Sequence, residues 1–319
     1  MITKLVRRGE FHYVRISIID LGFNSLKIVN YQVNDDKTFF PFYQKNNYLR
    51  LGEGLNGNGK LKQKYINKTI SALRSYRKII ESQSIDTTLS YATSAVRDAK
   101  NQDDFVNQVF EKTKFRFKIL SSEDEANISY LGALYSVNVA NGLYFDIGGG
   151  SLELLYTENR KIKKMFFLPL GALKLSLKYL NPFTKYSIND TNYSKLFDEI
   201  LNYLPNSEEI KLKKNSTLVG IGGTVRALLK YHNEINNINS YFNRHVNTLS
   251  YNTIKAINNK LLVMPLNEIS KIKSIGEKRA RSIVAGSCVI ELLMRKLKFA
   301  SIVISNTGLR EGILLNYLD

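Results

Sequence analysis

Two short segments of this chain carry the same pattern of a carboxylate followed by a glycine turn. Residues 18–26 read IIDLGFNSL, and residues 144–152 read YFDIGGGSL. In each segment an apolar run ends in an aspartate, Asp20 or Asp146. A buried strand of this kind places its carboxylate at a sheet edge, where N–H groups of the turn point into the same space. That chemistry suits a metal–phosphate ligand. Because the pattern occurs twice, it predicts two similar halves that face one cleft.

Two glycine-rich turns that follow apolar segments are candidate phosphate cradles. They comprise Gly148, Gly149, Gly150 and Ser151 in one case, and Gly222, Gly223 and Thr224 in the other. Glycine lets the backbone approach a ligand closely, and N–H groups of such turns can hold phosphate oxygens. A tight turn without a ligand is the more common reading of a single glycine pair. Neither turn matches the Walker pattern or the dinucleotide fingerprint, so neither identifies a ligand by itself.

A carboxylate cluster and an arginine add further candidate chemistry. Residues 122–125 read Ser-Glu-Asp-Glu, which matches the Ser-x-x-Glu signature of a helix start. A helical wheel does not select which of Asp124 and Glu125 acts in catalysis. Arg97 follows an expected strand end, where its guanidinium could hold a phosphate through two hydrogen bonds. Pairing of Arg97 with Asp98 or another nearby acid is an equally good interpretation.

The periodicity of apolar residues predicts the elements that position these groups. Strands are predicted at 14–20, 27–33, 38–43, 89–93, 116–120, 143–146, 152–156, 218–221 and 302–305. Helices are predicted at 61–81, from 103 onward, at 123–135, at 225–231 and over most of the chain between 247 and 302, with a closing segment at 308–317. The asparagine-rich stretch 232–247 is expected to be a surface connection. Strands and helices intermix, so the predicted fold class is α/β.

Charge is the unusual feature of the composition. The chain carries 46 Lys and Arg against 28 Asp and Glu, a formal net charge of +18. Lys60, Lys64 and Lys68 would share one face if their segment is helical. Such a face attracts polyanions, whether nucleic acid, polyphosphate or an acidic membrane, although a merely solvated face is an equally good reading. Nucleic acid is disfavoured, because no RNA-binding aromatic signature, zinc finger or heptad array accompanies the charge.

The remaining composition predicts a cytoplasmic globular protein of two domains. The most apolar stretch, residues 282–294, contains Glu291 and is shorter than the roughly 18 residues that a membrane span needs. No export signal is expected, because the first 15 residues contain no continuous apolar run. Cys288 is the only cysteine, so an internal disulfide is excluded. The three histidines, His12, His232 and His245, form no metal-binding pattern.

Taken together, the segments resemble the exopolyphosphatase/guanosine pentaphosphate phosphohydrolase (Ppx/GppA) family. Eight blocks match in order: residues 20–25, 50–55, 92–97, 125–126 with 131–132, 146–154, 168–172, 222–228 and 308–312. One block would be weak evidence, but eight in order are specific. The resemblance implies a two-domain fold of the actin-like and sugar-kinase-like (ribonuclease H-like) type with an interdomain cleft. It implies domain I at 1–121 plus 303–319 and domain II at 122–302.

The resemblance also implies a role for each matched position. Glu125 resembles the general base that activates a water, and Arg97 resembles the cleft arginine. Asp146 and Glu153 resemble carboxylates that hold Mg²⁺ or the attacking water, with Asp20 as a further metal ligand. The implied phosphate-binding residues lie in three turns: Asp20, Gly22, Asn24 and Ser25 in the first, Gly148, Gly149, Gly150 and Ser151 in the second, and Gly222, Gly223 and Thr224 in the third.

The chain departs from the family pattern at three positions. Phe23 stands where the family usually has serine, which removes a hydroxyl from the first phosphate loop. Ser122 replaces a usual glycine, and Asp124 replaces a usual glutamate. The chain also resembles the short form of the family, which lacks the C-terminal helical region with its HD-type motif.

The leading hypothesis is a Mg²⁺-dependent exopolyphosphatase that removes the terminal phosphate of inorganic polyphosphate. A positioned water, a base and positive groups around the phosphoryl oxygens are what this hydrolysis needs. The alternatives are hydrolysis of guanosine pentaphosphate, an actin-type ATPase or sugar kinase, and a non-catalytic binder of polyphosphate or nucleic acid. A membrane partner is not expected. The sequence leaves open chain-length preference, the metal and the oligomeric state, for which a homodimer is one alternative.

Overall fold

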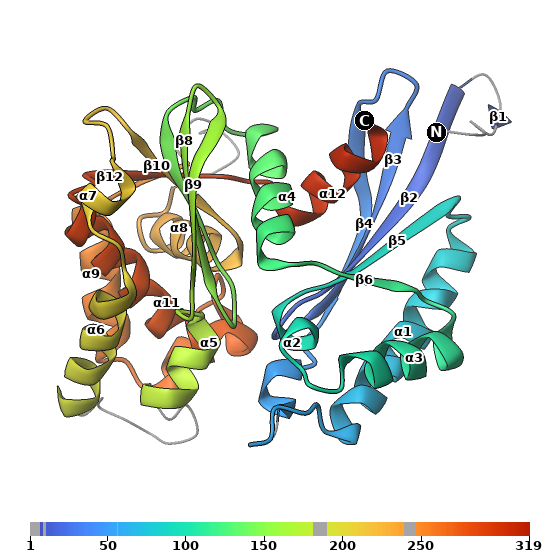
Figure 1. The fold of residues 1–319 in the computed structure, drawn as a ribbon, viewed down its shortest axis with the longest axis horizontal. Helices are drawn as coiled ribbons and strands as arrows, with labels where there is room; N and C mark the ends of the chain where they lie inside the picture. Colours follow the sequence, from blue (N-terminus) through green and yellow to red (C-terminus); the bar gives the residue numbers. More distant parts are fainter. Residues whose placement is uncertain (1–6, 9–10, 56, 181–189, 239–246) are drawn as a thin grey trace. The chain divides into compact units, whose positions relative to one another are not determined.

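A computed structural model of the chain shows two compact units (Figure 1). It describes residues 7–8, 11–55, 57–180, 190–238 and 247–319. Unit 1 comprises residues 1–125 and 312–319, and unit 2 comprises residues 126–311. Helices and strands intermix in both units, which confirms the predicted α/β class. The domain boundaries inferred from the sequence stay a prediction.

Unit 1 is built on a sheet whose strands follow the order β4-β3-β2-β5-β6. The strands are β2 (Phe11–Leu21), β3 (Leu26–Asn34), β4 (Phe39–Asn47), β5 (Thr87–Ala92) and β6 (Phe117–Ile119), and the short β1 (Arg7–Arg8) pairs with β2. Strands β2, β3 and β4 form an antiparallel meander, whereas β5 and β6 continue the sheet parallel to β2. The carboxyl ends of β2, β5 and β6 therefore meet at one edge of the sheet, where α/β proteins commonly bind ligands.

The helices of unit 1 pack on this sheet. They are α1 (Gln63–Ser82), α2 (Ser94–Arg97) and α3 (Gln102–Thr113), and the short 3₁₀ turn η1 (Leu51–Gly54) precedes α1. Helix α1 is amphipathic: Ile66, Ile70 and Leu73 recur at helical spacing and are buried in the core of unit 1. The helix begins after Lys60, so the predicted shared face holds for Lys64 and Lys68 but not for Lys60.

Unit 2 is built on a second sheet with the order β11-β12-β10-β7-β8-β9. The strands are β7 (Gly142–Ile147), β8 (Leu152–Glu158), β9 (Lys161–Leu168), β10 (Thr217–Ile221), β11 (Thr248–Ser250) and β12 (Ser301–Ile304). Strands β7, β8 and β9 form an antiparallel meander, and β10 and β12 continue the sheet parallel to β7. This is the strand arrangement of unit 1 repeated, with β11 added at the edge against β12.

The helices of unit 2 surround a core dominated by one long helix. They are α4 (Ser122–Leu134), α5 (Ala172–Leu175), the π-helical η2 (Ser176–Leu180), α6 (Asp190–Tyr203), α7 (Ser207–Ile210), α8 (Gly223–Ile235), α9 (Tyr251–Leu262), α10 (Leu266–Ile269) and α11 (Gly276–Leu297). Helix α12 (Leu309–Leu318) begins in unit 2, and most of it belongs to unit 1. The boundaries between the units fall within α4 and α12. Helix α11 is buried along most of its length.

The predicted strands and helices are present, but the structure contains further elements that were not predicted. Among the helices these are α6 and the short α2, α5, η2 and α7. Strand β9 was not predicted because several of its residues are exposed lysines, and β11 is only three residues long. Helix α8 extends to Ile235, into the stretch predicted as a surface connection, and residues 239–246 of that stretch lie outside the described residues. Within the described ranges, no helix is long and apolar enough to span a bilayer.

Candidate active site

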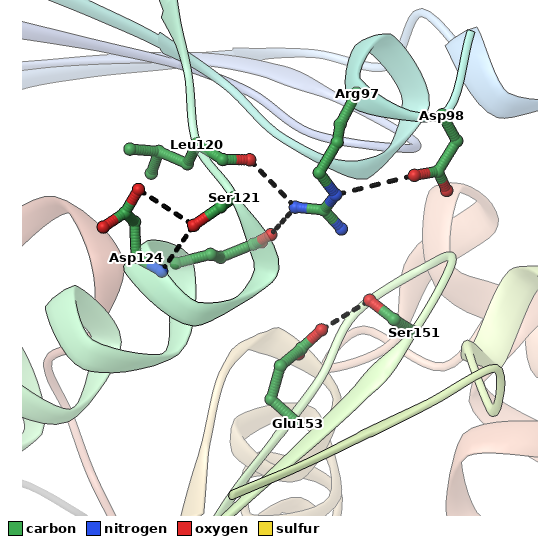
Figure 2. Close-up of polar contacts among 8 residues, drawn as sticks. Arg97, Asp98, Leu120, Ser121, Asp124, Ser151 and Glu153 are labelled. Atoms are coloured by element: carbon green, nitrogen blue, oxygen red, sulfur yellow. Dashed lines mark hydrogen bonds and ion pairs between the residues drawn. The ribbon is translucent and has the colours of Figure 1, made fainter.

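The predicted base and the predicted cleft arginine form an ion pair in unit 1. Arg97 Nη1 lies 2.8 Å from Glu125 Oε2, and the same nitrogen donates to the carbonyl of Leu120 at 3.2 Å. Arg97 Nε lies 3.5 Å from Asp98 Oδ1. Figure 2 shows Arg97 with Leu120 and Asp98 around its guanidinium. The side chains of Arg97 and Glu125 are 17% and 18% exposed, so the pair is sheltered but reachable from solvent.

The start of α4 distinguishes Glu125 from its neighbour Asp124. The Ser121 hydroxyl donates to Asp124 Oδ2 at 2.9 Å, and it accepts from the Asp124 N–H at 3.0 Å (Figure 2). The helix start therefore uses Ser121 and Asp124, one residue earlier than the predicted Ser122–Glu125 capping pair. This arrangement occupies the Asp124 carboxylate locally, whereas the Glu125 carboxylate extends to Arg97. The two neighbouring carboxylates therefore have different partners, and the role of Glu125 as general base stays a prediction.

The first phosphate turn follows β2 in unit 1. Its shape is held by a hydrogen bond from the Gly22 N–H to the Ser25 carbonyl at 2.9 Å. The carbonyls of Phe23 and Asn24 accept from Gly52 and Arg50, so the turn is fastened to η1. At the end of β2, Asp20 ion-pairs with Lys27 at 3.5 Å. The carboxylate of this copy is therefore balanced by a cation on the neighbouring strand.

The packing of Phe23 explains why an aromatic residue is accommodated where the family usually has serine. A methyl group added to Gly52 would lie 2.0 Å from the Phe23 ring, so the ring lies directly against the glycine backbone. Phe23 also packs against the hydrophobic core of unit 1. The ring therefore contributes to packing between the turn and η1. An apolar ring that packs against η1 thus replaces the serine hydroxyl expected from the family pattern.

The second phosphate turn has the same backbone shape in unit 2. The Gly148 N–H donates to the Ser151 carbonyl at 3.0 Å, matching the bond between Gly22 and Ser25. The Ser151 hydroxyl donates to Glu153 Oε1 at 2.5 Å (Figure 2). Glu153 lies on β8 directly opposite Asp146 on β7, and it is only 3% exposed. Opposed positions on antiparallel strands project from the same face, so two carboxylates are brought together here.

The backbone around this turn requires glycine. A Cβ added to Gly171 would lie 2.1 Å from the carbonyl carbon of Gly150, so the two chains pass in direct contact. The N–H groups of Ala172 and Leu173 donate to the carbonyls of Gly148 and Gly149. The turn is thus braced from one side by the start of α5.

The third turn, between β10 and α8, lies beside Asp146. Gly222 has φ of 93°, and an added Cβ would lie 2.5 Å from Asp146 Oδ1. Thr224 is buried in the first turn of α8. An added Cβ on Gly223 would lie 2.7 Å from Arg279 Nη2, which places that guanidinium against the turn. Sequence reasoning missed Arg279, because it comes from the distant helix α11 and no local motif marks it.

Arg226 is a second cation that sequence reasoning did not assign. Its Nη1 donates to the carbonyls of Ser305 and Asn306 at 3.2 and 3.0 Å. Burial lowers its pKa from the usual arginine value, as do the charges of Arg310 and Arg279, whereas Asp146 and Glu311 oppose that shift. Arg226 therefore ties α8 to the segment after β12 and lies in the electrostatic field of Asp146.

The donor set in unit 2 fits a magnesium ion. Among the described residues, no group of three or more His, Cys, Asp and Glu side chains could hold a metal. Mg²⁺ commonly uses only one or two carboxylates, with waters and substrate phosphates completing its shell. Asp146 and Glu153 supply such a pair, and like charges placed opposite each other are costly without a cation. Asp20 is instead paired with Lys27.

The structure thus assembles the predicted residues into two sets. Unit 1 brings together the first turn, Arg97 and Glu125 at the carboxyl ends of β2, β5 and β6. Unit 2 brings together Asp146, Glu153 and the second and third turns at the carboxyl ends of β7 and β10. That the two sets face one cleft stays a prediction.

Comparisons with known proteins identify relatives of this chain. A sequence model of the Ppx/GppA phosphatase family matches residues 31–319. The bifunctional 3-dehydroquinate synthase/phosphatase of Fusobacterium nucleatum is 30% identical over 329 residues; the alignment covers 100% of this chain and 48% of that protein, about half its length. Exopolyphosphatase 1 of Mycobacterium bovis is 27% identical over 314 residues, covering 96% of this chain and 89% of that protein.

Solved structures give the same result for the fold. The Ppx/GppA family member of Aquifex aeolicus superposes with a TM-score of 0.77 at 25% identity, covering 96% of this chain and 98% of that one. An exopolyphosphatase of Cytophaga hutchinsonii superposes with a TM-score of 0.84 at 20% identity over the same shares, a likeness of fold alone. The resemblance inferred from the eight sequence blocks is confirmed, and the chain belongs to the Ppx/GppA phosphatase family.

Proposed function

We propose that this protein is an exopolyphosphatase that hydrolyses the terminal phosphoanhydride of inorganic polyphosphate, with Glu125 as general base. The observation that carries the proposal is the ion pair between Arg97 and Glu125 at the meeting point of three strand ends. Family membership and relatives named as exopolyphosphatases support the choice of substrate.

The residues of this pair suit a hydrolysis by water. Glu125 accepts a proton from a water whose oxygen forms a bond to the terminal phosphorus, and the bridging P–O bond breaks. The products are inorganic phosphate and a polyphosphate one unit shorter. Arg97 holds the Glu125 carboxylate through Nη1, and its Nη2 has no hydrogen-bond partner among the described residues. That nitrogen is available for a phosphoryl oxygen, an interaction for which guanidinium is well suited.

The remaining residues supply binding and charge. Asp146 and Glu153 would hold Mg²⁺, with Asp20 as the further ligand that the resemblance implies. When bound, the ion neutralises negative charge on the phosphoryl oxygens. The turns at 22–25, 148–151 and 222–224 would present N–H groups to the phosphates. Hydrolysis of guanosine pentaphosphate uses the same terminal chemistry, and it and the homodimer stay predictions.

The base assignment is tested by comparing two neighbouring carboxylates. Glu125→Gln should lower phosphate release from polyphosphate by about 100-fold or more, because proton acceptance is lost while the side-chain shape is kept. Binding of polyphosphate, measured by fluorescence anisotropy, should remain nearly intact. Asp124→Asn is the matched control, since it removes a carboxylate from the same helical turn and should retain most activity. Full activity in Glu125→Gln, or equal losses in both variants, would contradict the role of Glu125.

The reaction itself is tested by substrate choice. Phosphate release with Mg²⁺ is measured for long polyphosphate, guanosine pentaphosphate and ATP at equal concentrations of terminal phosphate. Preference for polyphosphate supports the proposal. Preference for guanosine pentaphosphate would change the substrate, and sugar-stimulated ADP formation would indicate a kinase. Salt-sensitive binding without phosphate release under any divalent metal would indicate a non-catalytic binder.

A further inference from the structure

One face of α1 carries a continuous row of basic side chains. Lys64, Lys68, Arg74 and Lys78 are all exposed, and their spacing confines them to about a third of the helix circumference. The row is roughly 21 Å long at 1.5 Å of rise per residue. None of these four side chains forms an ion pair with a carboxylate of the described residues, and the only acid within α1 is Glu81 in its last turn.

The amino-terminal end of this row is fastened to the segment that follows α2. The Leu61 N–H donates to Asn101 Oδ1 at 2.8 Å, and Asn101 Nδ2 donates to the Leu61 carbonyl at 3.2 Å. The Lys100 N–H donates to the Gly59 carbonyl at 2.9 Å. A Cβ added to Gly59 would lie 3.6 Å from Lys100 Cε, so the Lys100 side chain lies along this loop. Exposed Lys62 and Lys100 therefore lie near the amino-terminal end of the row.

This end of the row leads to α2, whose last residue pairs with the candidate base. Helix α2 ends at Arg97, three residues before Lys100, and Arg97 pairs with Glu125. All of these residues belong to unit 1. We propose that the α1 track, defined as Lys62, Lys64, Lys68, Arg74, Lys78 and Lys100, binds the distal part of a long inorganic polyphosphate chain whose terminal phosphate is at Arg97 and Glu125. The proposal rests on the proposed function of that site.

The chemistry of the track favours polyphosphate over other polyanions. Proteins that bind single-stranded nucleic acid add exposed aromatic rings on which bases stack. The only aromatic side chains of α1 are Tyr65 and Tyr76: Tyr76 is fully buried, and the partly buried Tyr65 packs against the core and lies 5.2 Å from Lys68 Nζ. An interfacial membrane helix exposes a large apolar face, whereas the apolar face of α1 is buried in the core. A row of amine and guanidinium charges without rings or apolar side chains suits a polyanion that has neither bases nor acyl chains.

A track of this kind changes substrate capture more than chemistry. Clustered positive charge raises the local concentration of a polyanion and the association rate, and added salt screens the effect. The track residues do not touch the reacting phosphate, so they contribute to KM and not to kcat. A chain of only a few phosphates is too short to reach along the 21 Å row. The effect should therefore depend on chain length.

The test variant replaces Lys64, Lys68, Arg74 and Lys78 with glutamine, a residue that favours helix nearly as well as lysine. The control variant replaces four exposed lysines of unit 2 with glutamine: Lys161, Lys163, Lys255 and Lys271. Both variants lose the same net charge. Circular dichroism and a thermal melt establish that each is folded.

The α1 variant should raise the KM for long polyphosphate by about tenfold or more, because four phosphate contacts are lost. Its kcat, and its KM for tripolyphosphate, should match the unaltered protein. The dependence of binding on salt should become less steep, while the control variant should show neither change. Equal effects in the two variants, or equal effects on long and short chains, would overturn the proposal.

Binding measurements separate this proposal from the proposed function. Fluorescently labelled long polyphosphate and single-stranded RNA of equal charge are titrated in the Glu125→Gln background, where turnover does not interfere. A loss of affinity for polyphosphate in the α1 variant supports the track even if the protein releases no phosphate from any substrate. A loss confined to RNA would overturn polyphosphate as the occupant. Retained polyphosphate affinity would overturn the track itself.

Discussion

At the scale of residues, Asp20 and Asp146 lie near the ends of equivalent strands, but different residues face them. A cation faces Asp20, and a second carboxylate faces Asp146. Lys27 lies opposite Asp20 on the next strand, whereas Glu153 lies opposite Asp146. The first carboxylate is thus neutralised within the protein. The second faces another carboxylate, and Arg226 also lies in its electrostatic field. The repeated Asp–Gly turns therefore lie in different electrostatic surroundings in the two units, and the metal ligands implied by the resemblance stay a prediction.

A substitution at Gly222 tests whether the turn beside Asp146 requires glycine. Gly222→Ala should lower the free energy of unfolding by about 1–3 kcal/mol, because φ of 93° is strained for alanine. The new Cβ would also lie 2.5 Å from Asp146 Oδ1 and displace that carboxylate, so phosphate release should fall. Urea unfolding and a phosphate-release assay measure the two effects.

Gly57→Ala is the matched control for this substitution. No atom lies within 4 Å of the Cβ that would be added there, and its φ is not positive. Its stability should stay within about 0.5 kcal/mol of the unaltered protein. If Gly222→Ala behaved like this control in both assays, the turn would not depend on glycine.

The candidate site residues were easier to find in the sequence than the contacts that their side chains make. The blocks around Glu125, Asp146 and Glu153 stand out as local motifs. The different partners of Asp124 and Glu125 were not predicted, because Ser121 caps α4 one residue earlier than the motif suggested. Arg279 reaches its turn from a helix more than 50 residues later in the chain, and only tertiary structure shows such a contact.

At the scale of elements, parallel strands explain why distant segments share a site. Strands β2, β5 and β6 end at one edge of their sheet, and β7, β10 and β12 end at one edge of the other. The pattern of apolar residues predicted these strands. Strand β9 was missed because its exposed lysines break that alternation. Strand β9 pairs with β8, its partner in a tight hairpin, and this pairing holds it in the sheet.

Arg226 tests how the elements of unit 2 are fastened together. Arg226→Gln should lower the free energy of unfolding by roughly 1.5–3 kcal/mol, because hydrogen bonds from a charged donor to the carbonyls of Ser305 and Asn306 are lost. Arg295→Gln is the control, since Arg295 is an exposed residue of α11. Urea unfolding compares the two. Equal stabilities would show that α8 is not held to the segment after β12 through this side chain.

At the scale of the whole molecule, one strand arrangement serves two units with separate cores. The repeat of Asp–Gly turns predicted this duplication, and both sheets join an antiparallel meander to parallel strands. The strongly basic composition is a property of the whole chain, with a formal net charge of +18. In unit 1, part of this positive charge lies in the α1 track. The amino-acid composition does not show which residues form that track; the structure places Lys60 outside α1.

Buried acids that remain neutral in the native protein determine its response to alkaline pH. Burial raises the pKa of Cys288 to about 12, and it raises the pKa of Tyr76 and Tyr144 above the usual tyrosine range. In the unfolded chain the thiol loses its proton near pH 9. Between pH 9 and 12 the native state therefore binds more protons than the unfolded state, and the free energy of unfolding must fall as the pH rises.

Removing the Cys288 thiol measures its own share of this pH dependence of stability. Its contribution between pH 9 and 10.5 is about 2 kcal/mol, at 1.36 kcal/mol per pH unit for one proton. Urea unfolding from pH 7 to 10.5 should show a steep loss of stability in the unaltered protein and a shallower loss in Cys288→Ala. Comparing slopes separates proton linkage from the lost contact between the thiol and Asn258, which shifts stability equally at every pH below 9. A slope that is identical in the two proteins would mean that the native thiol ionises as readily as the unfolded one, and that the core around α11 is open to water.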